Sequence, residues 1–216
     1  MYADVCVCVL VSNSVNYHPF YVFSECRYEH ITQNVEHFWR LKQILHKDVL
    51  EKLRECFKSE FQAKYNLVWE DNSTSGNFFL MKIPHTKKPD QPITFTVSQG
   101  NTEEFNGDAL YYCLLDCGTD LLESETRTNV EKLRAQSKAL DDATSTNLPD
   151  KDFRARLQEI QDVYRTLQWD QSQLCEVTQR PLSRDDKYML TKEKLGKSVT
   201  SMSFSRSNGL ILIWCY

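Results

Sequence analysis

The cysteines and histidines are the residues of this chain that could bind a metal or act as nucleophiles. Cys113 and Cys117 lie four residues apart in a segment with a helical pattern, so both thiols would share one helix face. Two thiols alone do not make a zinc site, and no Cys or His pair of suitable spacing lies near them in the sequence. Cys6 and Cys8 share one face of a predicted strand. We interpret both pairs as packed, structural thiols.

Common catalytic motifs are not found in the sequence. The five histidines form neither an HExxH motif nor a metal triad. None of the six glycines lies in a GxGxxG or Walker pattern, so no phosphate-binding loop is predicted. We therefore predict that the protein is not an enzyme, with no catalytic residues, no metal, no cofactor and no small-molecule substrate.

The composition indicates a folded chain without a general affinity for polyanions. The 216 residues are 41% hydrophobic and 12% aromatic, which suffices for a core. The net charge is -4, so contact with nucleic acid would need a local basic patch or a partner. The first ten residues lack a basic n-region, and no apolar run approaches the roughly 20 residues that cross a bilayer. We expect reduced cysteines, no membrane contact, and a location in the nucleus, with the cytoplasm as the alternative.

Residues 1–105 are predicted to form a small antiparallel β head, which makes the fold class α+β. In 93–99, Ile93, Phe95 and Val97 alternate with polar residues, as is typical of a strand with one buried face. Predicted strands occupy 5–11, 20–23, 65–70, 77–83 and 93–99, the first two as a hairpin.

A helix-turn-helix insert is predicted within this head. Residues from about 30 to 63 place apolar side chains at helical spacing, in two runs. Asp48 stands at the start of the second run, and we predict that it caps the second helix.

Residues 106–176 are predicted to form a helical coiled-coil stalk with a break at 143–150. Pro149 cannot continue the first helix but suits the start of the next. The second helix spaces its apolar residues alternately by four and three, the period of a narrow coiled-coil seam. The first helix is weaker because its middle is polar, and 124–131 could equally be solvated. The predicted seam comprises Leu115, Leu122, Leu133, Leu140, Phe153, Leu157, Ile160, Tyr164, Leu167 and Leu174.

Residues 177–216 are predicted to be a mobile tail that ends in the apolar run LILIWCY. Exposed apolar runs promote aggregation unless they are covered. The run could be a strand docked on the head, a partner motif, or an ending specific to one form of the protein, and we favour the partner motif. The basic residues could touch phosphates. The predicted contacts are Lys192, Lys194, Lys197, Arg206, Leu210, Ile211, Leu212, Ile213 and Trp214.

The order of β head, helical insert and stalk resembles the end-joining scaffold superfamily of XRCC-four, XLF and PAXX, on the XLF/PAXX side. The resemblance spans roughly residues 5–175. It is carried by the insert FWRLKQILHKDVLEKLRECF, with its Trp-containing helix and D-x-L-x-x-L-[KR]-x-x-F pattern. It is also carried by the passage from 65 to 117, similar in layout to paired strands that run into a stalk helix.

The resemblance implies a non-catalytic homodimer that acts in DNA double-strand-break repair by non-homologous end joining. Such scaffolds bridge DNA ends through the Ku heterodimer and other end-joining factors. DNA would be contacted indirectly or through the basic tail. Two alternatives use a similar architecture: a coiled-coil scaffold of the centriolar cartwheel type, and a trafficking adaptor with a longin-like head and a SNARE-like helix.

Overall fold

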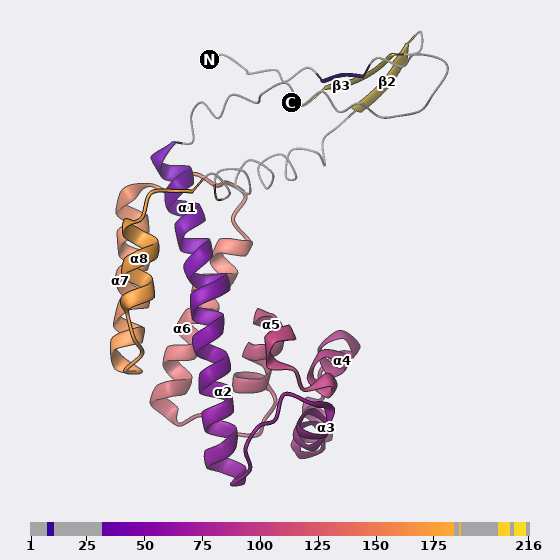
Figure 1. The fold of residues 1–216 in the computed structure, drawn as a ribbon, viewed down its shortest axis with the longest axis vertical. Coiled ribbons are helices and arrows are strands. Elements are labelled where there is room, and N and C mark those ends of the chain that lie inside the picture. Colours follow the sequence, from indigo (N-terminus) through magenta and orange to yellow (C-terminus); the bar gives the residue numbers. More distant parts are fainter. Residues whose placement is uncertain (1–7, 11–31, 184–185, 187–202, 208–209, 215–216) are drawn as a thin grey trace. The chain divides into compact units, whose positions relative to one another are not determined.

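The computed structural model describes residues 8–10, 32–183, 186, 203–207 and 210–214 (Figure 1). The chain divides into two compact units. One unit comprises Met1–Ile31 with Pro181–Tyr216, and the other comprises Thr32–Arg180.

The first unit contains a three-stranded antiparallel sheet in the order β1-β3-β2. Its strands are β1 (Cys8–Leu10), β2 (Ser203–Ser207) and β3 (Leu210–Trp214). In this sheet Leu212 of β3 lies opposite Val9 of β1 and Ser205 of β2.

The sheet includes part of the segment that we predicted as a mobile tail. Arg206 lies in β2, and the tail contacts from Leu210 to Trp214 make up β3, which pairs with β1 and β2. The predicted contacts Lys192, Lys194 and Lys197 lie outside the described residues, as does the predicted strand 20–23.

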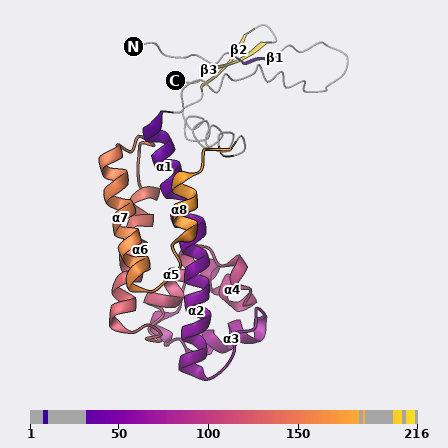
Figure 2. The same ribbon diagram turned by 60° about the vertical axis from the view of Figure 1, so that its left-hand side comes forward.

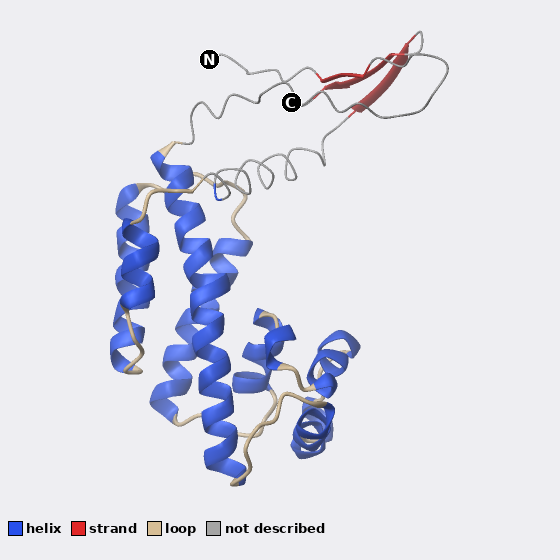
Figure 3. Cartoon of the chain, viewed as in Figure 1, coloured by secondary structure: helices blue, strands red, loops and turns tan. Residues whose placement is uncertain are grey.

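The second unit, Thr32–Arg180, is built from helices and contains no strand (Figure 3). The α-helices are α1 (Gln33–Gln43), α2 (Val49–Tyr65), α3 (Ser73–Lys82), α4 (Gln91–Gln99), α5 (Gly107–Tyr111), α6 (Ser124–Asp141), α7 (Asp150–Thr166) and α8 (Ser172–Gln179). Two π-helical turns, η1 (Ile44–Asp48) and η4 (Tyr112–Asp116), and two 3₁₀ turns, η2 (His85–Lys87) and η3 (Thr102–Glu104), complete the unit.

A single long helix, formed by α1, η1 and α2, runs through this unit (Figure 1). Thr32 caps its start, because the side chain accepts a hydrogen bond from the Val35 amide at 3.4 Å. No glycine or proline interrupts residues 33–65, and the helix ends where Asn66 adopts φ 52°. The predicted turn between two helices is therefore wrong. Asp48 makes no capping bond and is instead buried inside η1.

The predicted α+β fold with an antiparallel β head is wrong, because its strands 77–83 and 93–99 lie largely in α3 and α4 and 65–70 is mainly a loop. Asn72 Oδ1 accepts hydrogen bonds from the amides of Thr74 at 3.0 Å and Ser75 at 3.2 Å, so the segment between the predicted strands 65–70 and 77–83 starts a helix. Asp90 caps α4 in the same way, by accepting from the Ile93 amide.

The period-two pattern of 93–99 misled the strand prediction because it also contains a helical pair. Ile93 and Val97 are four residues apart, and both pack towards the core of the unit. Phe95, two residues from each, is 67% exposed. Thr96 donates its hydroxyl proton to the carbonyl of Pro92 at 3.1 Å, a bond available to threonine inside a helix.

A glycine allows α3 and α4 to pack closely. A Cβ atom at Gly76 would lie 2.1 Å from the Val97 carbonyl oxygen, a distance that no side chain can occupy. Gly100 ends α4 with φ 72°, and its neighbourhood includes the Asn72 backbone at the start of α3. The two helices therefore form a tight helical hairpin, defined here as residues 72–100.

The predicted continuous stalk helix from 106 to 142 is also broken. It consists of α5 and η4, a non-helical stretch around Gly118 with φ 69°, and then α6. The helix α6 ends at Asp141 and α7 begins at Asp150, with Pro149 at the N-cap. Helix α1 packs against α6, α7 and α8, whereas α2 packs against α5 (Figure 2).

Candidate interaction site on the helical hairpin

The predicted seam residues lie in the core of the helical unit. Eight of them are buried: Leu115, Leu122, Leu133, Leu140, Phe153, Ile160, Tyr164 and Leu174. Leu157 and Leu167 are half-buried and pack against the same core. The ring of Phe153 stacks on His37 of α1, with ring centroids 4.5 Å apart. The seam therefore packs against helices of its own chain.

The cysteine pair that sequence analysis singled out is structural. Cys113 is 0% exposed and Cys117 is 1% exposed. The Cys117 Sγ atom lies 2.9 Å from the Cys113 carbonyl oxygen and 2.9 Å from Thr119 Oγ1. Burial raises the pKa of both thiols, which keeps them protonated and unreactive. Among the described residues no group of three His, Cys, Asp or Glu side chains could hold a metal ion.

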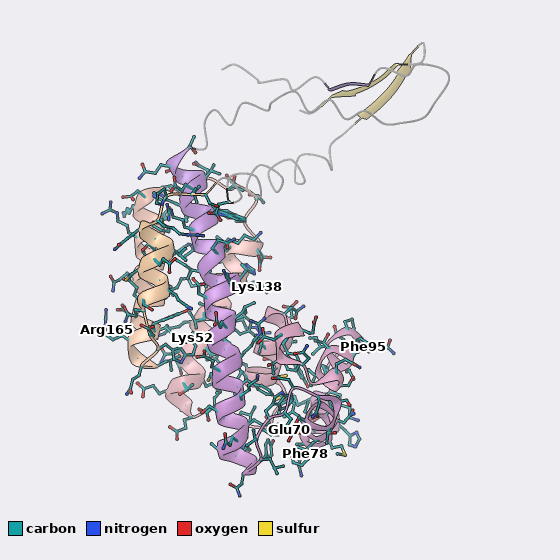
Figure 4. All side chains as sticks on the ribbon, viewed as in Figure 1. Lys52, Glu70, Phe78, Phe95, Lys138 and Arg165 are labelled. Carbon is teal, nitrogen blue, oxygen red and sulfur yellow. The ribbon has the colours of Figure 1, made fainter. Side chains whose placement is uncertain are left out.

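The most exposed large apolar side chains of the helical unit lie on the hairpin and in the loop that leads to it. Met81 on α3 is 76% exposed and Phe95 on α4 is 67% exposed. Val68 and Leu67, in the loop before α3, are 66% and 47% exposed. Large apolar groups gathered on one element are typical of an interaction surface. Figure 4 labels Phe95 and Phe78 on this hairpin.

Phe78 connects this surface to the body of the unit. Its ring is half-buried and meets the ring of Tyr65 edge-on at 5.6 Å between centroids. The Lys82 Nζ atom lies 4.8 Å from the Phe78 ring centroid, a cation–π contact at the surface. An apolar ring with a cation above it can accept both an apolar and an acidic group.

The hairpin stands on a rigid aromatic base. Trp69 is buried, and its indole N–H donates to the Gly100 carbonyl at 3.0 Å. Its ring meets Phe57 at 4.8 Å and Phe61 at 4.9 Å between centroids, both edge-on. The exposed groups of the hairpin are therefore held in place by buried ones.

The Asp71 carboxylate, directly before the hairpin, connects it to neighbouring elements through hydrogen bonds. Its carboxylate accepts from Lys58 Nζ at 2.7 Å and from the Thr102 hydroxyl at 2.7 Å. Burial alone would raise the pKa of Asp71, but the hydrogen bonds from Lys58 and Thr102 outweigh burial and lower it. Asp71 therefore stays ionised and holds the hairpin to α2 and η3.

A basic pocket of about 540 Å³ lies beside the hairpin, between η2, η4 and α6. Its cations are Lys87, Lys88 and Arg127, and its acids are Asp116 and Asp120. The Tyr112 hydroxyl, also in the pocket wall, donates to the Lys87 carbonyl and so fixes η2 against η4.

The two lysines of this pocket are its unpaired cations. Arg127 pairs with Glu131 at 3.3 Å, and Asp116 pairs with Arg134 at 2.8 Å. Lys87 and Lys88 are exposed, and their ammonium groups contact no partner among the described side chains. The hairpin carries three lysines against one aspartate, a net +2 on a chain of net charge -4. This local sign favours an acidic partner.

Sequence analysis named one residue of this site, Phe95, but expected it on the buried face of a strand. Lys87 and Lys88 were not among the predicted contacts. The exposure of Phe95 follows from the helix, since Ile93 and Val97 take the inner face. Assigning residues 93–99 to a helix would have predicted that Phe95 is exposed, but the alternating pattern favoured a strand.

Comparisons with known proteins found no match for this chain among family models, curated proteins or solved structures. No helix within the described segments is long and apolar enough to span a bilayer.

Proposed function

We propose that this chain is a non-catalytic, protein-binding scaffold whose helical hairpin docks an acidic segment of a partner protein. The observation that carries this proposal is the presence of exposed Met81 and Phe95 on the same element as the unpaired Lys87 and Lys88. The partner segment would place apolar side chains on the hairpin and carboxylates near the lysines.

The apolar side chains and the lysines of the hairpin would contribute to binding in different ways. Desolvation of Phe95 and Met81 would supply the affinity, because burying such side chains removes a large apolar area from water. The lysines would guide encounter and orientation, since exposed charge pairs add little net stability. The aromatic base around Trp69 keeps the ordering cost low, because the surface is fixed before binding.

The more specific role in end joining does not carry over into this proposal. It was inferred from a β head followed by a stalk, and Thr32–Arg180 has neither. The same order of elements suggested the cartwheel and trafficking alternatives. Binding to Ku, homodimer formation and nuclear location stay predictions from sequence.

The test is a selection of random peptides displayed on phage against the immobilised full-length protein. We expect enrichment of peptides that combine Asp or Glu with aromatic or aliphatic residues. Enrichment should be lost with Lys87→Glu/Lys88→Glu and, independently, with Phe95→Ser. All three positions are exposed, so neither variant should disturb folding.

Lys151→Glu is the matched control, because Lys151 is an exposed lysine on α7 with no ion-pair partner among the described residues. It should select the same peptides as the unchanged protein. Absence of any enriched peptide, or enrichment that survives both hairpin variants, would contradict the proposal.

A further inference from the structure

Few side chains hold α8, the last helix of the helical unit, in its place. It packs mainly against α1 and η1. Leu174 is its one buried side chain, at 0% exposure, and Val177 is half-buried against the core. The helix has eight residues, and isolated helices shorter than roughly 12–15 residues are marginal in water. The structure of α8 therefore depends on these few contacts.

Arg40 of α1 makes the polar contacts that hold the C-terminal end of α8. Its guanidinium donates hydrogen bonds to the carbonyl of Val177 and, at 2.7 Å, to the carbonyl of Arg180. The last carbonyls of a helix have no partner inside it, so an arginine at this end satisfies them and complements the helix dipole. Glu36, also on α1, accepts from Arg40 Nε at 2.9 Å and orients the guanidinium. Arg40 therefore keeps its ion pair with Glu36 when α8 moves away.

The chain before α8 is fixed at Trp169. Its amide donates to the Tyr164 carbonyl at 2.8 Å, and the two rings meet edge-on at 5.2 Å between centroids. Asp170, the next residue, accepts hydrogen bonds from the amide of Ser172 at 3.0 Å and from its hydroxyl at 2.6 Å. These bonds stay within the segment that contains α8. The contacts on either side place a hinge between Trp169 and Asp170.

Docking of α8 buries a polar atom that has no hydrogen-bond partner. This atom is Oε1 of Gln173, on α8 itself. Oδ2 of Asp48, in the turn η1 on which α8 packs, is also buried and unpaired. Such groups cost free energy in the closed state, because water satisfies them once they are exposed. Hydration of the Gln173 oxygen therefore offsets part of the apolar contact that is lost when α8 detaches.

We propose that α8 is a detachable strap. Residues 170–180 leave α1 and η1 as one segment while the other helices of Thr32–Arg180 stay folded, and Arg40 is the residue that holds the strap closed. Opening uncovers the part of the core that Leu174 covers, which becomes apolar surface on the helical unit. It also frees residues 170–180 as a longer connection to the residues from Pro181 onwards.

Hydrogen–deuterium exchange of the full-length protein, followed by mass spectrometry, tests the proposal. Local opening lets the hydrogen-bonded amides of α8 exchange without unfolding of the unit. We expect these amides to exchange at least about a hundredfold faster than the slowest amides of α2 and α6. Low concentrations of urea should accelerate exchange in α2 and α6 but barely change it in α8, since opening of the strap exposes little surface.

Three variants identify what holds the strap. Arg40→Met removes both bonds to α8, and Leu174→Ala removes its apolar anchor, so each should accelerate exchange in α8 at least about tenfold. Arg54→Met is the matched control, because Arg54 of α2 donates to the carbonyls of Thr102 at 2.8 Å and Phe105 at 3.1 Å. These contacts persist when the strap opens. Arg54→Met should therefore accelerate exchange in α2 and α6 and leave α8 unchanged.

Two results would overturn the proposal. One is exchange of the α8 amides as slow and as dependent on urea as that of α2 and α6. The other is an Arg54→Met variant that accelerates exchange in α8 as much as Arg40→Met and Leu174→Ala do. In either case α8 would open only when the whole helical unit unfolds.

Discussion

A single buried polar side chain without a hydrogen-bond partner lowers the stability of this helical unit. Asp48 is 5% exposed, and its Oδ2 atom has no hydrogen-bond partner in the structure. Burial is the main cause that raises the pKa of Asp48 above its ordinary value. The nearby Tyr164 hydroxyl is also buried and unpaired, so it does not solvate the carboxylate. Asp48 was predicted as a helix cap, and the structure gives it no such bond.

We predict that Asp48→Asn stabilises the protein at pH 7, by roughly 1 kcal/mol, because it removes a buried charge. The folded state holds the Asp48 proton more tightly than the unfolded state. The protonated carboxyl is therefore favoured below the ordinary aspartate pKa of about 3.9, and stability is lost as pH rises through the folded pKa. The difference between variant and unchanged protein should be large at pH 7 and small near pH 4.

Urea denaturation at the two pH values measures this difference. Asp152→Asn is the control, because Asp152 is exposed in the first turn of α7, where a carboxylate favours the helix dipole. It should destabilise slightly at pH 7. A destabilising Asp48→Asn would mean that the carboxylate has a partner that stabilises its charged form.

At the scale of elements, the same residues can satisfy two periodic patterns, and packing decides between them. The run ITFTVSQ alternates like a strand, yet Asp90 caps it and Ile93 and Val97 share a helix face. The helical spacing of residues 33–65 predicted helix correctly, although the turn expected at Asp48 is absent. Backbone contact between α3 and α4 depends on Gly76, and no local pattern reports it.

The hairpin therefore gives an element-scale prediction. Gly76→Ala should lower the free energy of unfolding by about 2–3 kcal/mol, because its Cβ would overlap the Val97 carbonyl and force α3 from α4. Gly107→Ala is the matched control. Its Cβ would lie 3.7 Å from the nearest atom, at ordinary contact distance, so the change should be neutral or slightly stabilising.

Chemical denaturation followed by circular dichroism separates the two variants. An equal effect of both substitutions would indicate that the contact between α3 and α4 carries no special constraint. Loss of stability in Gly76→Ala should also weaken peptide binding by the hairpin, since Phe95 lies on the displaced helix.

At the scale of the whole molecule, the seam of α7 could be found from the sequence but its partner could not. Heptad spacing indicates that a helix has one narrow apolar face, and this face can pack on a second chain or on the same chain. In this structure the apolar face of α7 packs on its own chain, against α1 and α6. The hairpin surface escaped prediction for a different reason, since it depends on residues 93–99 forming a helix instead of the predicted strand.

An intrachain seam has a consequence that a homodimeric seam does not share. Stability that comes from association rises with protein concentration, whereas stability within one chain does not. We therefore expect the melting temperature of the full-length protein to stay constant over about a hundredfold range of concentration. Ile160→Asp, at a position that is 0% exposed, should lower the free energy of unfolding by about 3–5 kcal/mol, again independently of concentration. Ala155→Asp, at an exposed position of the same helix, should have little effect. A melting temperature that rises with concentration, and ceases to do so in Ile160→Asp, would instead place the seam between two copies of the chain.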